Sequence, residues 1–408
     1  MTINSFLARR VLTANPSATK AVTLKAKQLR DQGRDIITLS QGELDFDTPQ
    51  PIREAARTAM DQGQTRYTEV AGSAELRQAV QHKFQSENGL NYSLDQIQVA
   101  SGAKQILFNA FQATLNEGDE VLIPTPSWPS YPEMVRLASG EPRLLRCGEN
   151  AGFKLTPEQL RAAINDNTKW LLLNNPANPS GALYTQSELR ALGEVLQDYP
   201  QVWVIADEIY EHLRYDDQPF TSFAAAVPEL SERTLTINGL SKAWAMTGWR
   251  VGYCAGPEPL IKALNLLQSQ STSHASSISQ AAALSALKQP HTFITECVTE
   301  LTRRRDLVVA SIQQIPGLSC RVPQGAFYVF VNCQSLLGQV TAAGQTLDTD
   351  QDVALYLLEE ADVAVVPGSA FDLPGYFRLS YGNALPQLEE AMRRISVACN
   401  NLVAGDNV

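Results

Sequence analysis

Residues 238–253 read NGLSKAWAMTGWRVGY, and this stretch decides how the fold and the rest of the chain are interpreted. It contains one lysine, Lys242, and no Asp or Glu lies within eight positions of that lysine on either side. Such a lysine is a candidate for Schiff-base chemistry, because an amine must be neutral to attack a carbonyl. Arg250 follows eight positions later and could hold a phosphate. Lys242 alone is weak evidence, since an isolated lysine between apolar residues is usually a surface side chain.

The small residues Gly239, Ser241 and Ala243 would let a flat ring approach the backbone beside Lys242. A reactive lysine, room for a flat ring and a nearby guanidinium for a phosphate together indicate pyridoxal 5'-phosphate (PLP) as the cofactor. Three further segments, in the order and spacing that a PLP site needs, support this interpretation.

Length and composition restrict the class of protein. The 408 residues are too many for one ordinary core and indicate two domains. A hydrophobic content of 44% and a charged content of 19% are typical of a soluble globular enzyme. The net charge of −10 argues against nucleic acid as a partner, because phosphate backbones select basic surfaces.

The six cysteines are scattered and include no CxxC pair, which is typical of free thiols in a reducing compartment. The four histidines form no HExxH or similar motif, so no metal is expected. The sequence shows no signal peptide and no run of eighteen apolar residues. We therefore expect a cytoplasmic protein with no membrane partner.

Short apolar runs alternate with helical periods along the chain, which predicts an α/β fold with a mostly parallel sheet. Ligands of such sheets bind at the carboxyl ends of the strands. The predicted strands cover residues 36–39, 96–100, 120–124, 170–173, 202–206, 235–238, 325–331 and 377–380. The predicted helices cover residues 51–62, 73–87, 103–115, 259–267, a long stretch from about 300, and 385–398.

Two of these strands end in polar groups that suit a PLP ring. Asp207 follows an apolar strand, and a carboxylate buried there is costly unless it is paired, as it would be with a protonated pyridine nitrogen. Tyr210, three residues later, could bond the phenolic oxygen of the ring. Asn178 lies in a proline-rich turn that would hold its amide rigidly. An Asp that caps a helix and a plain loop are the structural alternatives.

A phosphate and a carboxylate have candidate partners as well. Residues 101–105 form a strand-to-helix turn, and the free N–H groups of a helix N-terminus bind phosphate. Trp128 follows the next strand and could stack on the ring, although a core Trp is the more frequent case. Arg378 lies between apolar residues and could grip an α-carboxylate with two hydrogen bonds, unless it forms a structural salt bridge.

Taken together, these segments resemble the class I (aspartate-type) aminotransferases of PLP fold type I. The resemblance runs from about residue 39 to the last predicted helix and is carried by four ordered blocks: residues 178–181, 207–210, 239–252 and 377–381. The blocks at 42–49, 245–250 and 270–273 resemble the bacterial Iβ-type branch of aspartate aminotransferases. Two positions depart from the pattern, namely Leu44 where many members have Pro and Gly239 where some have Ser.

The resemblance implies fold type I, with a large domain built on a mostly parallel seven-stranded sheet flanked by helices, and a smaller α+β domain. It places the large PLP-binding domain at residues 49–299 and the small domain at residues 1–48 and 300–408. It also implies a homodimer with shared active sites, in which Tyr67 reaches the phosphate in the neighbouring subunit.

Site roles follow from the resemblance. Lys242 would be the Schiff-base lysine, Asp207 would pair with the pyridine nitrogen, and Tyr210 and Asn178 would bond the ring oxygen. Trp128 would stack on the ring. The remaining contacts would be Ala103, Lys104 and Arg250 to the phosphate, and Gly42 and Arg378 to the substrate α-carboxylate, with Asn178 and Trp128 also touching the substrate.

The implied reaction moves an amino group between an L-amino acid, with aspartate as the leading candidate, and a 2-oxo acid such as 2-oxoglutarate, by ping-pong kinetics through pyridoxamine phosphate. Aromatic amino acids, prephenate or alanine are alternative substrates, and a β-lyase or an oxidase could use the same residues. A PLP-binding regulatory module is the non-enzyme alternative. Residues 269–277, which include His274, are the candidate lining for a second carboxylate.

Overall fold

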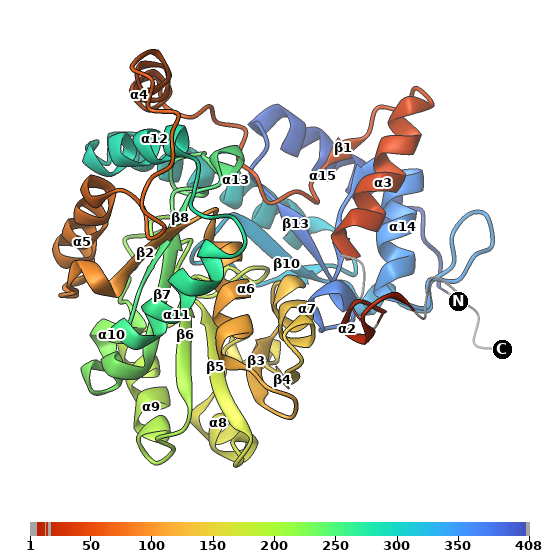
Figure 1. Ribbon diagram of the computed structural model, residues 1–408. Coiled ribbons are helices and arrows are strands. Elements are labelled where there is room, and N and C mark those ends of the chain that lie inside the picture. The colour runs from red at the N-terminus through yellow and green to blue at the C-terminus, as the bar shows by residue number, and fades with distance from the viewer. Residues whose placement is uncertain (1–5, 13, 15–17, 405–408) are drawn as a thin grey trace.

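The computed structural model describes residues 6–12, 14 and 18–404 (Figure 1). Its largest sheet has seven strands, and only β8 runs antiparallel to its neighbours. The prediction of a mostly parallel sheet is therefore confirmed, although β4 and β8 were not foreseen. The strands, in spatial order, are β2 (Ile97–Ala100), β8 (Gly252–Ala255), β7 (Thr234–Gly239), β6 (Trp203–Asp207), β5 (Thr168–Asn174), β3 (Glu120–Thr125) and β4 (Glu141–Arg146).

Both faces of this sheet are buried, because successive side chains of a strand point to opposite faces. In β5, Trp170 and Leu172 pack into one hydrophobic cluster, and Leu171 and Leu173 pack into another. The first cluster also holds side chains of α6 (Ala103–Thr114), α7 (Ser130–Leu137) and α11 (Glu258–Ser269). The second holds side chains of α8 (Pro157–Ala163), α9 (Gln186–Gln197) and α10 (Phe223–Ala226).

A third group of helices covers the β2 end of the sheet, where α12 packs against both α4 and α5. Ser73 caps α5 and its hydroxyl accepts a hydrogen bond from the backbone N–H of Leu76 at 3.3 Å. The sequence predicted α4 and α5 to within one residue at each end, but it did not predict α12. The three helices are α4 (Gln50–Asp61), α5 (Ala74–Asn88) and α12 (Ser277–Lys288).

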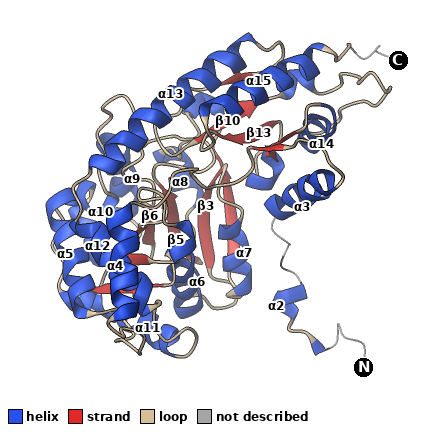
Figure 2. Cartoon of the chain, turned by 90° about the horizontal axis from the view of Figure 1, so that it is seen from above, coloured by secondary structure: helices blue, strands red, loops and turns tan. Residues whose placement is uncertain are grey.

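The C-terminal part builds a second, antiparallel sheet beside the first (Figure 2). Its strands, in spatial order, are β12 (Val366–Pro367), β13 (Tyr376–Ser380), β10 (Tyr328–Asn332) and β9 (Ser319–Cys320). The N-terminal strand β1 (Ile37–Thr38) joins this part by pairing in parallel with β11 (Val363–Ala364). The other helices are α2 (Arg9–Leu12), α3 (Ala18–Asp31), α13 (Thr292–Gln314), α14 (Asp350–Glu360) and α15 (Leu385–Asn400).

Helix α13 begins before the predicted start near residue 300 and continues without a break through residue 299. The division of the chain at 48/49 and 299/300 stays a prediction. Short 3-10 helices complete the fold at Leu94–Gln96, Glu149–Ala151, Pro228–Arg233, Thr247–Trp249, Gln334–Leu336 and Gly368–Phe371. Among the residues that the structure describes, no helix combines the length and the apolar character needed to cross a membrane.

Candidate active site

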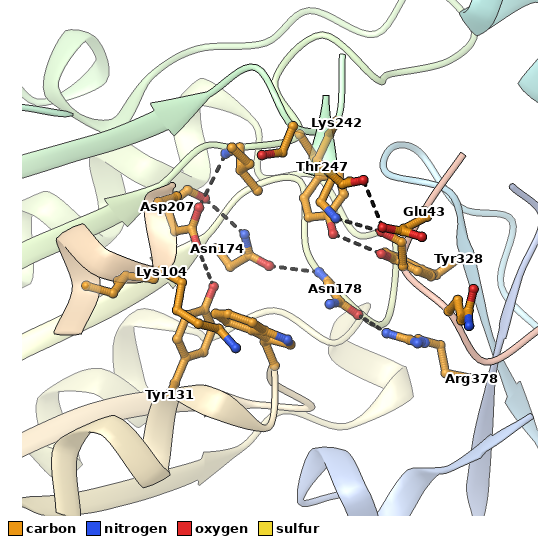
Figure 3. A pocket seen from close by; sticks show the side chains of 18 of the residues that line it. Glu43, Lys104, Tyr131, Asn174, Asn178, Asp207, Lys242, Thr247, Tyr328 and Arg378 are labelled. Atoms are coloured by element: carbon orange, nitrogen blue, oxygen red, sulfur yellow. Dashed lines mark hydrogen bonds between the residues drawn. The ribbon is translucent and has the colours of Figure 1, made fainter. Parts of the chain in front are cut away.

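A cavity of about 660 Å³ lies where the carboxyl ends of β5, β6 and β7 face the second sheet. Its volume is in the range of small-molecule sites. Figure 3 shows side chains from both parts of the chain pointing into it. Ten of the eleven predicted site residues line this cavity: Gly42, Ala103, Lys104, Trp128, Asn178, Asp207, Tyr210, Lys242, Arg250 and Arg378.

Lys242 follows the end of β7, and its amine donates a hydrogen bond to the carbonyl oxygen of Gly42 at 2.7 Å. The amine also lies 5.7 Å from the ring centroids of Tyr210 and Phe327. Burial, followed by the positive charge of Arg378, lowers the pKa of Lys242 to about 8. A substantial fraction of this amine is therefore neutral near physiological pH, as nucleophilic attack requires.

Asp207 ends β6 and is buried. Its carboxylate accepts hydrogen bonds from the hydroxyl of Tyr131 at 2.6 Å and from the backbone N–H of Ile209 at 3.3 Å. Burial raises the pKa of Asp207 to about 6, against these hydrogen bonds and the nearby charge of Lys242. A carboxylate held in this way would be stabilised by a cationic ligand.

Asn178 lies in the proline-rich turn after β5 and is held on both sides. Its backbone N–H donates to the side-chain oxygen of Asn174 at 2.8 Å, and Asn174 in turn donates to the carbonyl of Asp207 at 3.0 Å. The side-chain oxygen of Asn178 accepts a hydrogen bond from Arg378 at 3.1 Å. The turn thus couples the Asp207 side of the cavity to the Arg378 side.

Arg378 belongs to β13 of the second sheet and is fully enclosed, between the rings of Tyr328 and Phe371 at 4.5 and 5.0 Å. Its hydrogen bonds go to neutral oxygens, those of Asn178 and the Ser40 carbonyl, and its Nε has no partner in the described part of the chain. Burial lowers the pKa of Arg378. A buried guanidinium without a counter-charge is suited to an anionic ligand.

The opposite end of the cavity is built for a second anion. Gly102 caps α6 with a φ of 93°, and the Arg250 guanidinium lies so close that a Cβ at Gly102 would meet its Nη2 at 2.5 Å. Arg250 itself has a positive φ of 56° and donates to the carbonyl of Thr247 at 3.0 Å. The N-terminus of α6 and this cation therefore converge, a combination that binds phosphate groups.

Beside this cradle, Trp128 borders the cavity next to Lys104, whose ammonium lies 4.5 Å from the Trp128 ring centroid. The ring of Tyr131 contacts Trp128 edge-on at 5.3 Å. An aromatic wall is thus fixed between the anion cradle and Asp207.

Tyr67 is the predicted site residue that the cavity does not contain. Its side chain is 91% exposed, and its ring contacts His274 edge-on at 5.6 Å. No residue of 269–277 lines the cavity of the same chain. The expected substrate lining and Tyr67 therefore lie together, outside this cavity.

Several lining residues were not singled out from the sequence. The hydroxyl of Tyr328 bonds that of Tyr210 at 2.9 Å, and Thr247 donates to Glu43 at 2.8 Å. Tyr131 lies three residues after Trp128 on the first turn of α7, which is a spacing that could have suggested it. Tyr328 could not be found in this way, because a tyrosine in an apolar strand is usually a core residue.

The unusual Gly239 has a packing explanation. A Cβ at this position would lie 3.0 Å from Cδ1 of Ile209 and 3.1 Å from Cα of Gly252. A side chain here would therefore press on the turn after β6 and on the neighbouring strand β8.

The fold and the cavity together define an α/β enzyme with a weakly basic amine, a buried carboxylate and two separate anion positions. Comparison with known proteins makes this specific. The family model for aminotransferase class I and II matches residues 34–395, and the chain belongs to this family of aminotransferases.

The similarity to curated relatives extends over almost the whole chain. An aspartate aminotransferase of Rhizobium meliloti is 50% identical and covers 98% of this chain and 100% of its own. An aspartate/prephenate aminotransferase of Cereibacter sphaeroides is 51% identical with the same coverage. Solved structures of the aspartate aminotransferases of R. meliloti and Thermus thermophilus, the latter with maleate, match with TM-scores of 0.95 and 0.90, at 50% and 42% identity. The first match covers 97% of this chain and 99% of the solved chain, and the second 96% and 99%.

Proposed function

We propose that this protein binds PLP and moves the amino group of L-aspartate to a 2-oxo acid, with 2-oxoglutarate as the leading acceptor. The observation that carries the proposal is the convergence of Lys242, Asp207 and Arg378 on one cavity. The cavity also contains the cradle formed by the N-terminus of α6 and Arg250, which suits a phosphate. When bound, PLP supplies an electron sink for the Cα–H bond of the amino acid.

The residues of the chain would divide the work as follows. Lys242 would hold the cofactor aldehyde and, when free of it, would take the proton from the substrate Cα and deliver it to the former aldehyde carbon, a relay for which a pKa of about 8 is suitable. Asp207 keeps a proton on the ring nitrogen. Arg378 fixes the α-carboxylate, and its hydrogen bond with Asn178 orients both groups. Tyr210 and Asn178 would contact the ring oxygen, and Trp128 the ring face.

Aspartate is favoured because the relatives named above are aspartate aminotransferases, and one was solved with maleate, a dicarboxylate. Prephenate is the second candidate acceptor, because several relatives are named aspartate/prephenate aminotransferases. We also propose a homodimer, supported by the exposure of Tyr67, and a cytoplasmic location, supported by six free cysteines.

The test is Lys242→Ala. We expect this variant to lose amino transfer by at least about a thousandfold, since removal of a covalent catalytic group costs that much or more. In the unchanged protein, borohydride reduction followed by peptide mapping should fix PLP on Lys242. Lys262→Ala, at an exposed lysine paired with Glu258, is the control and should behave like the parent.

A panel of amino donors with 2-oxoglutarate and prephenate as acceptors separates the substrate candidates. Label on another lysine, or full transfer by Lys242→Ala, would contradict the proposed site. Release of pyruvate with ammonia, or consumption of oxygen, would indicate a lyase or an oxidase instead.

A further inference from the structure

A second cluster of metal-ligand side chains lies outside the cavity. The carboxylate of Glu87 and the ring nitrogens of His212 and His291 all lie within 4.8 Å of one another. They come from the last turn of α5, the turn after β6 and the residue before α13. The sequence predicted no metal because these residues show no ligand spacing, and only the fold brings them together.

The geometry of the cluster is close to that of a bound zinc ion. His212 Nε2 lies 2.8 Å from one Glu87 oxygen, and His291 Nε2 lies 3.3 Å from the other. Ligands at about 2.1 Å around a tetrahedral Zn²⁺ lie roughly 3.4 Å apart, so one of the two distances nearly equals this spacing and the other is shorter than it. Two histidines with one glutamate are a known zinc donor set that leaves a fourth position for water.

The surrounding charges allow a cation. The ammonium of Lys83 lies 3.6 Å from Glu87, but it is directed to the buried carboxylate of Glu211 and to the Asn88 side chain at 2.7 Å. The positive charge of Lys83 and the negative charge of Glu211 cancel. When both histidines are neutral, the negative charge of Glu87 is therefore available to bind a cation.

An ion can reach the cluster from solvent, and it would lie close to the segment that carries Lys242. The side chains of His291 and Glu87 are 45% and 28% exposed, so a path from solvent exists. Behind them is a small cavity bordered by Leu240 and Trp244, two residues to either side of Lys242 in sequence. The ring of His291 contacts that of Trp244 at 6.3 Å.

We propose that Glu87, His212 and His291 bind one divalent transition-metal ion of the Zn²⁺ class. The ion clamps α5, the turn after β6 and the start of α13 behind the segment that carries Lys242. The site is separate from the proposed PLP site, and its occupation does not depend on transfer activity.

The experiment titrates Co²⁺, a spectroscopic substitute for Zn²⁺, into the purified full-length protein loaded with PLP. We expect one Co²⁺ per chain, with the strong visible bands of tetrahedral cobalt, displaced by one equivalent of Zn²⁺. Competition with a chromophoric chelator then gives the Zn²⁺ affinity. Glu87→Gln, His212→Gln and His291→Gln should each weaken it at least about tenfold, since even outer partners of a metal site contribute that much.

His82→Gln is the matched control, because His82 is an exposed histidine of the same helix α5 and lies outside the cluster. Its Zn²⁺ affinity should equal that of the parent protein. Thermal unfolding in the absence of metal verifies that each variant is folded. Absence of stoichiometric cobalt binding would overturn the proposal, as would binding that all three ligand variants retain unchanged.

Discussion

Asp207 is a carboxylate whose burial opposes folding until a cationic ligand arrives. The pKa of Asp207 is raised from 3.8 to about 6, mainly by burial. The unfolded chain therefore releases this proton more readily than the folded chain does. Stability is highest below the unfolded pKa and is lost as the pH rises from about 4 to above 6, by about 3 kcal/mol in total, because one pKa unit corresponds to about 1.4 kcal/mol.

Asp207→Asn should therefore stabilise the cofactor-free protein while it impairs the proposed function. At pH 8 we expect a gain of up to about 3 kcal/mol in the free energy of unfolding, decreasing as the pH is lowered towards 4. Denaturant unfolding at several pH values measures this difference. Amino transfer should fall, since the ring nitrogen loses its anionic partner.

Asp166→Asn provides the comparison, because Asp166 is exposed in a turn before β5. This variant should match the parent at every pH. A stability difference for Asp207→Asn that does not change with pH would show that the effect is not electrostatic.

At the scale of elements, the anion cradle depends on a close approach between β8 and the start of α6. A Cβ at Gly252 would lie 2.3 Å from the backbone nitrogen of Ala103 and 2.6 Å from the carbonyl carbon of Gly102. Both contacts are with backbone, so no side-chain rotation can relieve them. Glycine at this strand position lets the helix N-terminus reach the cavity.

Gly252→Ala should cost about 1–3 kcal/mol in the free energy of unfolding, as overpacking of a well-packed interior usually does. It should also weaken PLP binding, because the first turn of α6 must shift away from Gly252 and leave its place in the anion cradle. Thermal unfolding and a PLP titration followed by fluorescence measure the two effects. Gly148→Ala, at a position with φ of −73° and open space for a Cβ, should leave both unchanged. Parent-like stability of Gly252→Ala would contradict the packing argument.

Most strands of the large sheet and several of the helices around it could be predicted, because the apolar runs and capping residues that specify them lie within each element. The apolar run at 170–173 gives β5, and the caps and periods around Ser73 give α5. Strand β4 escaped prediction because its sequence, EPRLLR, is half charged and lies at the sheet edge. Strand β8 is short and lies between two strands that precede it in the chain, so its place depends on the topology.

At the scale of the whole molecule, the site is assembled from distant segments. The loop that carries Gly42 is held by α13, where the Arg304 guanidinium donates to Asp45 at 2.7 Å and to the Gly382 carbonyl at 2.9 Å. The strand β13 then brings Arg378 to the cavity. The one predicted site residue outside the cavity is Tyr67, which is expected to act in the neighbouring subunit.

The homodimer can be tested by mixing two variants, each of which lacks one of the expected site residues. Lys242→Ala and Tyr67→Ala, co-expressed with different tags, should form mixed dimers in which one of the two sites is intact. With random pairing, about a quarter of all sites are then complete. The activity of the mixture should therefore exceed that of each of the two variants measured alone. The mass in solution should be twice that of the 44.7 kDa chain.

Two controls accompany this test. Co-expression of Lys242→Ala with Gly148→Ala measures the activity of dimers in which Lys242→Ala chains merely dilute chains with an intact site. Recovery that does not exceed the average of the separately purified Lys242→Ala and Tyr67→Ala proteins would mean that Tyr67 serves its own subunit or no site.

By itself, the sequence determined the α/β class, through apolar strands that end in chemically distinctive side chains such as Lys242 and Asp207, and its resemblance to a known family named ten residues that share one cavity. Only the tertiary structure decided that Tyr131 and Tyr328 complete the cavity and that Glu87, His212 and His291 meet elsewhere. These contacts join residues that are far apart in the chain. Their proximity depends on packing between elements, and local patterns of side chains do not encode it.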